Sequence, residues 1–177
     1  MVTMRGNGCM RQGLIDLINW LPRTEIKMVE VGSYAGESAD IFASSDKTSQ
    51  IWCIDPWLPG YDQGDVASFS DFNEVERAFD LVAERHKGKI CKFKGVLNDF
   101  QTKFQNDVPD FIYIDANHTY EGCKADIQTA LLWNGLKLIG GHDYAGWCPG
   151  VIQAVDEIFG KPTITFADSS WVKVLNG

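Results

Sequence analysis

The sequence predicts an α/β domain in which a doubly wound, mostly parallel sheet is flanked by helices. Five short apolar runs alternate with segments of helical periodicity, and two more strand-like runs close the chain. Four of the first five runs end at polar or charged residues, and open α/β sheets bind ligands at that edge. One domain spanning residues 1–177 is the simplest organisation for a chain of this length.

Apolar spacing and turn-forming residues predict the first elements. Apolar residues recur at helical spacing over residues 13–21, and Pro22 ends this helix. An apolar run at 26–31, a helix at 37–45 and a second apolar run at 50–54 then form a strand–helix–strand unit. This unit predicts two neighbouring parallel strands.

The middle of the chain begins with a long connection. Residues 56–65 are rich in proline, glycine and aromatic side chains, and loops of this kind often act as lids. A helix is expected at 71–86, where apolar residues line one face, followed by an alternating strand at 89–94 and a short helix at 96–104. The remaining expected elements are strands at 110–115, 136–139, 163–166 and 171–175 and helices at 120–133 and 151–159.

The turn after the first strand indicates an adenosine-containing ligand. The strand carries Glu30 near its end, the turn Gly32-Ser-Tyr-Ala-Gly36 follows, and a second strand ends in Asp55 about twenty residues later. A dinucleotide-binding turn needs a glycine where Tyr34 stands, and Glu37 at the helix start would repel a pyrophosphate. A carboxylate there suits an ammonium or a sulfonium, and S-adenosylmethionine carries both without a phosphate.

This ligand gives the second strand a specific role. Asp55 is expected to accept hydrogen bonds from the ribose hydroxyls, and the adenine is expected to lie against Trp57 or Ile54. An ordinary strand–turn–helix with a helix-favouring glutamate is the alternative interpretation of the same residues.

Composition narrows the partners. A formal charge of −8 argues against a nucleic-acid substrate, so a small-molecule or glycan acceptor is expected. No run approaches the roughly 20 apolar residues of a membrane span, and residues 1–9 lack the apolar core of a signal peptide, so we expect a cytoplasmic protein. The five cysteines are widely spread without a CxxC pair, which disfavours a zinc site or a disulfide framework.

Two motifs give the chain a family resemblance. Residues 114–121 read Ile-Asp-Ala-Asn-His-Thr-Tyr-Glu, and residues 141–144 read Gly-His-Asp-Tyr. With the glycine-rich turn, these motifs resemble the class I S-adenosylmethionine-dependent methyltransferases, in a compact branch similar to macrolide and sugar O-methyltransferases. The resemblance implies a Rossmann-like seven-stranded mixed sheet in the order 3-2-1-4-5-7-6, with strand 7 antiparallel.

The resemblance also implies a cofactor site. Residues around Gly95 and Val96 would close the pocket on the other side of the adenine. With the turn and the strand ends, it predicts an S-adenosylmethionine site made of Glu30, Gly32, Ser33, Tyr34, Gly36, Ser38, Asp55, Trp57 and Asp115.

Asp115, His118 and Asp143 are the candidate catalytic residues. In one design His118 removes the acceptor proton, because the ordinary pKa of histidine suits work at neutral pH. In the other, Asp115, His142 and Asp143 hold Mg²⁺, which lowers the pKa of the acceptor hydroxyl. The chain departs from related enzymes by placing His142 and Asn117 where they have acidic residues. Structural roles for His118, as a helix cap, and for Asp143, as a turn residue, stay open.

The predicted function is transfer of a methyl group from S-adenosylmethionine to an oxygen of a small molecule or sugar. A homodimer is the assembly considered for it. The alternative is a catalytically silent S-adenosylmethionine-binding module that acts as a partner subunit. A nicotinamide-dependent oxidoreductase ranks third, because the turn lacks the glycine that a pyrophosphate requires.

Overall fold

The computed structural model describes residues 8–175. A cytoplasmic location was expected because residues 1–9 lack the apolar core of a signal peptide. Residues 1–7 of that segment lie outside the described part. Helix α1 runs from Gly8 to Trp20 and so begins five residues earlier than its apolar spacing predicted. Among the described residues, no helix combines the length and the apolar character needed to span a membrane.

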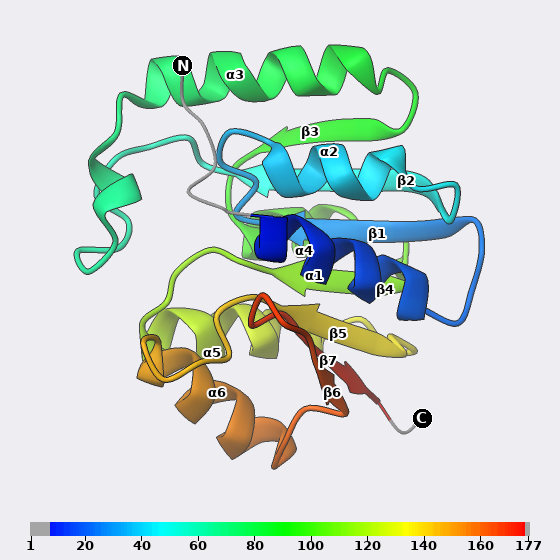
Figure 1. Cartoon of the computed structure of the whole chain (residues 1–177), viewed down its shortest axis with the longest axis vertical. Coiled ribbons are helices and arrows are strands. Elements are labelled where there is room, and N and C mark those ends of the chain that lie inside the picture. The colour runs from blue at the N-terminus through cyan, green and yellow to red at the C-terminus, as the bar shows by residue number, and fades with distance from the viewer. Residues whose placement is uncertain (1–7, 176–177) are drawn as a thin grey trace.

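Seven strands form one sheet in the order β3-β2-β1-β4-β5-β7-β6, which confirms the order implied by the resemblance (Figure 1). The strands β1 to β5 are parallel, and β7 runs antiparallel to both of its neighbours. The strands are β1 (Ile26–Val31), β2 (Thr48–Asp55), β3 (Ile90–Lys94), β4 (Phe111–Ile114), β5 (Leu138–Gly141), β6 (Ile164–Thr165) and β7 (Trp171–Val174).

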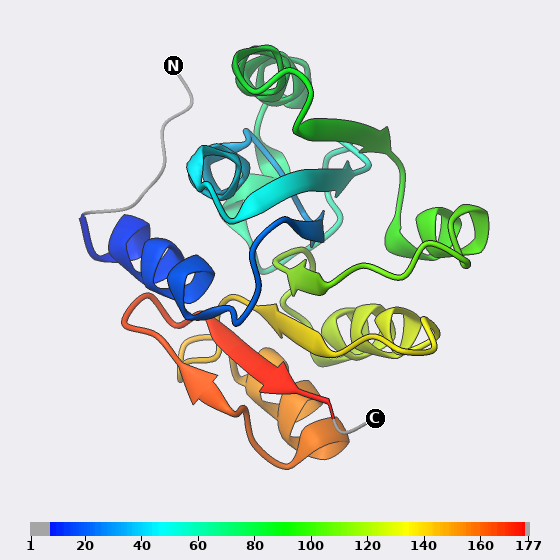
Figure 2. The same ribbon diagram turned by 90° about the vertical axis from the view of Figure 1, so that its right-hand side faces the viewer.

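The helices cover both faces of the sheet (Figure 2). Helices α1 to α3 pack on one face and α4 to α6 on the other, because successive strand residues alternate between two buried clusters. Met28 faces the first cluster and Val29 the second. The helices after α1 are α2 (Glu37–Ser44), α3 (Phe72–Arg85), α4 (Leu97–Lys103), α5 (Tyr120–Ala130) and α6 (Pro149–Phe159).

The fifth strand differs from its prediction. It was expected at residues 136–139, but β5 lies at Leu138–Gly141 and pairs from Phe111 onward with β4. Glycine is disfavoured in strands, so sequence patterning placed Gly140 and Gly141 in a loop. The neighbouring strands leave no room for side chains there, since a Cβ at Gly141 would lie 2.2 Å from the carbonyl oxygen of Ile114.

The parallel strands bring their carboxyl ends to one edge of the sheet. The loop that contains residues 56–65 projects beyond this edge, on the left of Figure 1, and continues into a short 3-10 helix at Val66–Phe69. Glu30, Asp55, Asp115, His142 and Asp143 all lie at or just beyond these ends. The fold therefore gathers the predicted site residues at a single edge.

Candidate functional site

The turn after β1 fits tightly between the two neighbouring strands. Gly32 has φ 88° and donates its backbone N–H to the carbonyl oxygen of Ile54 at 2.8 Å. On the other side, a Cβ at Gly32 would lie 2.0 Å from the carbonyl oxygen of Asp115. Gly36 closes the turn with φ 87°, donates to the carbonyl oxygen of Ser33 at 2.8 Å, and precedes α2. At position 32, only glycine combines an unstrained positive φ with the absence of a Cβ that would collide with Asp115.

Glu30 lies beneath this turn and is completely buried. Its Oε2 accepts a hydrogen bond from the Ser33 hydroxyl at 2.6 Å, whereas its Oε1 has no hydrogen-bond partner among the described residues. Burial raises the pKa of Glu30 to about 7, although the hydrogen bond from Ser33 partly offsets the rise. A buried, half-satisfied carboxyl of this kind is well placed to respond to a positively charged ligand.

The raised pKa of Glu30 predicts a pH-dependent stability. The carboxyl binds its proton more tightly in the folded chain, so its contribution to the free energy of unfolding falls as the pH rises from 4.5 to about 7 and is then constant. Over this interval the free energy of unfolding is expected to fall by about 3 kcal/mol, because one pKa unit corresponds to about 1.36 kcal/mol. Urea unfolding of the wild type and of Glu30→Gln across this interval measures it. Parallel stability curves would contradict the prediction.

Asp55, at the end of β2, is held by the turn. Its Oδ2 accepts from the backbone N–H of Tyr34 at 2.9 Å, and its Oδ1 accepts from the backbone N–H of Trp57 at 2.6 Å. The side chain is buried, which raises the pKa of Asp55 while these two hydrogen bonds lower it. The two amides fix the carboxylate but leave it further lone pairs, so it can still accept hydroxyl donors.

A pocket of about 260 Å³ opens between the ends of β1, β2 and β4. Ile54 and Asp55 line one side and Gly95 and Val96 another, so the structure brings together the residues expected to enclose an adenosine. Asp126 of α5 also lines the pocket, and burial raises the pKa of its carboxyl to about 6. Sequence patterning assigned it no role, because it is one of several polar residues of that helix.

Trp57 does not line this pocket. Its side chain is only 2% exposed and packs against Phe79, with ring centroids 4.8 Å apart. Its indole Nε1 donates to the backbone carbonyl of Tyr34 at 2.9 Å, and the Lys92 ammonium lies 4.7 Å from the ring centroid. The reason is backbone geometry, since φ at Trp57 is 47° and the chain turns sharply after Asp55. Trp57 therefore lies outside the pocket, whereas its alternative, Ile54, lines it.

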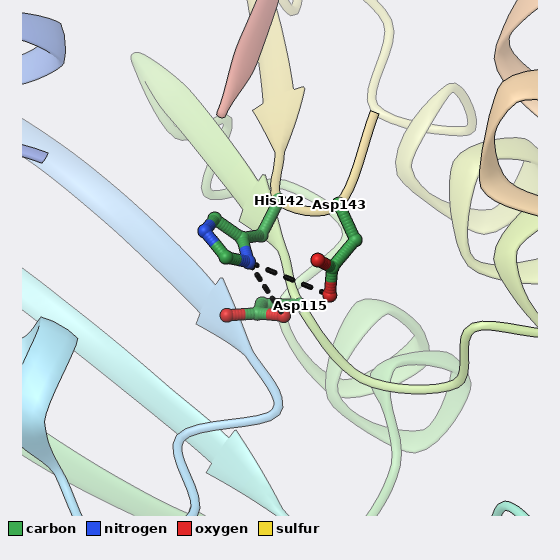
Figure 3. Close-up of side chains that lie close together, drawn as sticks. All are labelled: Asp115, His142 and Asp143. Atoms are coloured by element: carbon green, nitrogen blue, oxygen red, sulfur yellow. Dashed lines mark ion pairs between the residues drawn. The ribbon is translucent and has the colours of Figure 1, made fainter. Parts of the chain in front are cut away.

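Two carboxylates and an imidazole converge beside the pocket. Asp115 follows β4, and His142 and Asp143 follow β5 (Figure 3). His142 Nδ1 lies 3.4 Å from Asp143 Oδ2 and 3.9 Å from Asp115 Oδ1, and one ligand atom from each residue falls within 4.8 Å of the others. The structure thus brings together the three residues predicted to hold a metal.

His118 faces the same pair of carboxylates. Its Nε2 lies 3.1 Å from Asp143 Oδ2 and 3.6 Å from Asp115 Oδ1. Burial by itself would lower the pKa of His118, but Asp115 and Asp143 outweigh it and raise the pKa to about 11. Burial alone would raise the pKa of Asp143, but the two histidines hold it well below its usual range. A ring protonated at both nitrogens has no lone pair with which to accept a proton.

Asp62 anchors the 56–65 loop over this cluster. Its side chain is buried, its Oδ2 accepts from the backbone N–H of His118 at 2.9 Å, and it lies 3.3 Å from His118 Nδ1. Asn117 strengthens the attachment by donating its Nδ2 to the carbonyl oxygen of Tyr61 at 2.8 Å. A carboxylate at position 117 has no such donor, which accounts for the asparagine. Sequence patterning missed Asp62, whose sole signal was its place in an unusually long loop.

Asp168 supports the cluster from the opposite side. Its Oδ2 lies 3.8 Å from His142 Nε2 and accepts from the Ser170 hydroxyl at 2.8 Å. The sequence showed it only as one residue of a polar turn. Trp147 is 73% exposed and donates its Nε1 to Asp143 Oδ1 at 3.0 Å. The cluster is therefore surrounded by residues from four separate connections.

This chain is similar to known methyltransferases in sequence and in fold. A family model described as a methyltransferase domain matches residues 29–136. A calicheamicin methyltransferase has a TM-score of 0.68 and 14% identity over 94% of this chain and 77% of its own. An O-methyltransferase from Bacillus cereus, solved with S-adenosylhomocysteine, has a TM-score of 0.63 and 14% identity over 98% and 84%.

A third solved structure shares the fold with a lower TM-score. Aeropyrum pernix fibrillarin with bound S-adenosyl-L-methionine has a TM-score of 0.55 and 13% identity over 92% of this chain and 72% of its own. At such identities the structural matches show a shared fold. A search of curated protein sequences found no match.

Proposed function

Because this chain belongs to the methyltransferase-domain family, as a class I S-adenosylmethionine-dependent methyltransferase, we propose that it methylates a hydroxyl oxygen of a small molecule or sugar. The observation that carries the proposal is the contact between two regions of the site. Ala116 lines the nucleoside pocket, and its neighbour Asp115 belongs to the acid–imidazole cluster. A methyl donor in the pocket and an acceptor at the cluster would therefore meet at the end of β4.

The residues around the pocket suit S-adenosylmethionine. Asp55 would hold the ribose hydroxyls, and Ile54 and Val96 would lie on the two sides of the adenine. The turn from Gly32 to Tyr34 would contact the methionine part, above the buried carboxyl of Glu30. No phosphate has to be accommodated, and acidic residues around the turn favour a ligand with positive charge.

The cluster suits the acceptor side. Asp115, His142 and Asp143 would hold a divalent cation, which supplies a Lewis acid that lowers the pKa of a bound hydroxyl. The three side chains would also orient the acceptor oxygen toward the pocket. His118 contributes less as a base, because both of its nitrogens face carboxylates. We therefore favour the cation-assisted design over the His118 design.

The acceptor class follows from charge and from the relatives. The net charge of −8 disfavours a polyanionic acceptor. Two structural neighbours are a calicheamicin methyltransferase and an O-methyltransferase, which supports an oxygen of a small molecule or sugar as the acceptor. The 56–65 loop and the segment after Asp143 border the cluster and would select among such acceptors.

Asp55→Ala is expected to weaken S-adenosylhomocysteine binding by at least about tenfold, which corresponds to 1.4 kcal/mol. The change removes the proposed ribose contact and leaves the backbone N–H groups of Tyr34 and Trp57 without their acceptor. Isothermal titration measures the affinity, and Asp107→Ala, an exposed acid far from the pocket, is the matched control. Equal affinities for the two variants would remove Asp55 from the site.

A transfer assay tests the function itself. Methyl-labelled S-adenosylmethionine is offered with a panel of hydroxylated small molecules and sugars, with and without a chelator. Label transferred to an oxygen, lost with chelation and in Asp115→Asn, is the expected result. Transfer that survives chelation would reject cation assistance. Cofactor binding without transfer to any acceptor, together with a stable protein complex, would favour the silent partner subunit.

A further inference from the structure

We propose that the cluster is a transition-metal site rather than a magnesium site, with an imidazole nitrogen of His142 joining the carboxylates of Asp115 and Asp143, and with His118 packed against the two carboxylates. The proposal deepens the proposed function, on which it rests for the presence of a cation. It names the class of cation, which is a borderline divalent ion such as Fe²⁺, Co²⁺ or Zn²⁺.

The first support is the convergence of both rings on one pair of carboxylates. His142 presents Nδ1 to Asp143 Oδ2 at 3.4 Å and to Asp115 Oδ1 at 3.9 Å. His118 presents Nε2 to the same two oxygens, at 3.1 Å and 3.6 Å. His142 Nδ1 and one oxygen of each carboxylate therefore lie within 4.8 Å of one another, and His118 lies against the same two carboxylates.

The second support is a buried carboxylate behind each ring. Asp168 Oδ2 lies 3.8 Å from His142 Nε2, and Asp62 Oδ2 lies 3.3 Å from His118 Nδ1. Both acids are nearly inaccessible, with 6% and 3% exposure, and backbone N–H groups hold each of them. Metal-binding histidines commonly have an acid on the side of the far nitrogen, and here the 3.8 Å and 3.3 Å separations are electrostatic contacts rather than hydrogen bonds.

The donor set decides between cations. Mg²⁺ prefers oxygen ligands in a regular octahedron and keeps several waters. Imidazole nitrogen favours later divalent ions, whose affinities rise from Mn²⁺ toward Cu²⁺. His142 supplies a nitrogen donor beside the oxygen donors of Asp115 and Asp143. We infer that this nitrogen donor moves the preference of the site away from Mg²⁺.

The experiment compares Co²⁺ with Mg²⁺ on the full chain. Co²⁺ binding is followed through its visible absorption, and Mg²⁺ binding through displacement of Co²⁺. The wild type is expected to bind Co²⁺ at least about tenfold more tightly than Mg²⁺, and His142→Asp is expected to lower that ratio by about tenfold. Asp168→Asn, which keeps the donor atoms but weakens the support of His142, is expected to lose about 10- to 100-fold in Co²⁺ affinity.

Control measurements distinguish a loss of cation binding from a loss of folding and from a failure of the proposed function. His86→Gln removes another histidine that pairs with an acid, Asp40 at 2.7 Å, at the far end of α3, and it should leave the Co²⁺ affinity unchanged. S-adenosylhomocysteine titration of every variant reports on folding. Electron spin echo spectra of bound Mn²⁺ should show nitrogen couplings that weaken in His142→Asp.

Each outcome has one meaning. Equal affinity for the two ions, an unchanged ratio in His142→Asp, or no nitrogen coupling would overturn the transition-metal assignment while leaving a cation-assisted methyltransferase intact. Absence of cation binding, with cofactor binding retained, would overturn the assignment and the cation assistance together. Loss of cofactor binding in the wild type would contradict the proposed cofactor pocket instead.

Discussion

Gly32→Ala is expected to prevent stable folding, with a loss of roughly 4 kcal/mol or more in the free energy of unfolding. A Cβ at this position would lie 2.0 Å from the carbonyl oxygen of Asp115 and 2.7 Å from the Cα of Ala116, and neither backbone atom can move without shifting the end of β4. The positive φ of 88° adds a cost of about 1–2 kcal/mol. Urea unfolding, or the soluble yield if the variant does not fold, measures the effect.

Gly88→Ala is the matched control for this substitution. Gly88 has φ 95°, close to that of Gly32, but a Cβ there would meet nothing within 4 Å. It should therefore lose only the conformational term of about 1–2 kcal/mol. Similar losses in the two variants would show that the close approach of the turn to β4 does not constrain the site.

Trp57→Ala is expected to destabilise the chain by about 3–5 kcal/mol while leaving S-adenosylhomocysteine affinity nearly unchanged in the folded fraction. The indole is 2% exposed and packs between Phe79 and Lys92, so its removal leaves a cavity in the core and frees the carbonyl of Tyr34. A tryptophan that stacks on the adenine would behave oppositely, with a small loss of stability and a large loss of affinity. Urea unfolding and isothermal titration distinguish the two roles.

Trp147→Ala provides the comparison. This tryptophan is 73% exposed, and its one side-chain hydrogen bond among the described residues goes to Asp143. Its truncation should change the free energy of unfolding by less than about 0.5 kcal/mol, as is usual for surface positions. A comparable loss of stability in the two tryptophan variants would contradict the core position of Trp57.

The site could be predicted from the sequence where its signal was local. Glu30, the glycine turn and Asp55 belong to one strand–turn–helix–strand unit, and its spacing was enough to indicate an adenosine pocket. Asp115, His142 and Asp143 each follow a strongly apolar run. Because the carboxyl ends of parallel strands share an edge, their convergence followed from the predicted sheet.

Asp62 and Asp168 could not be predicted in the same way. Each meets its histidine through a contact between distant segments, and Asp62 lies 56 residues before His118. Nothing in their own neighbourhoods distinguishes them from other acids in polar loops. The direction of Trp57 was also hidden, because it depends on a positive φ and on space left by Phe79 of α3.

By itself, the sequence determined the α/β alternation, the turn that admits an adenosyl ligand and the acids at the strand ends, because each depends on residues close together in the chain. Only the tertiary structure decided which side chains enter the pocket, where β5 begins and how both histidines are held against the same two carboxylates. Those features depend on the space and the hydrogen-bond partners supplied by segments far apart in sequence.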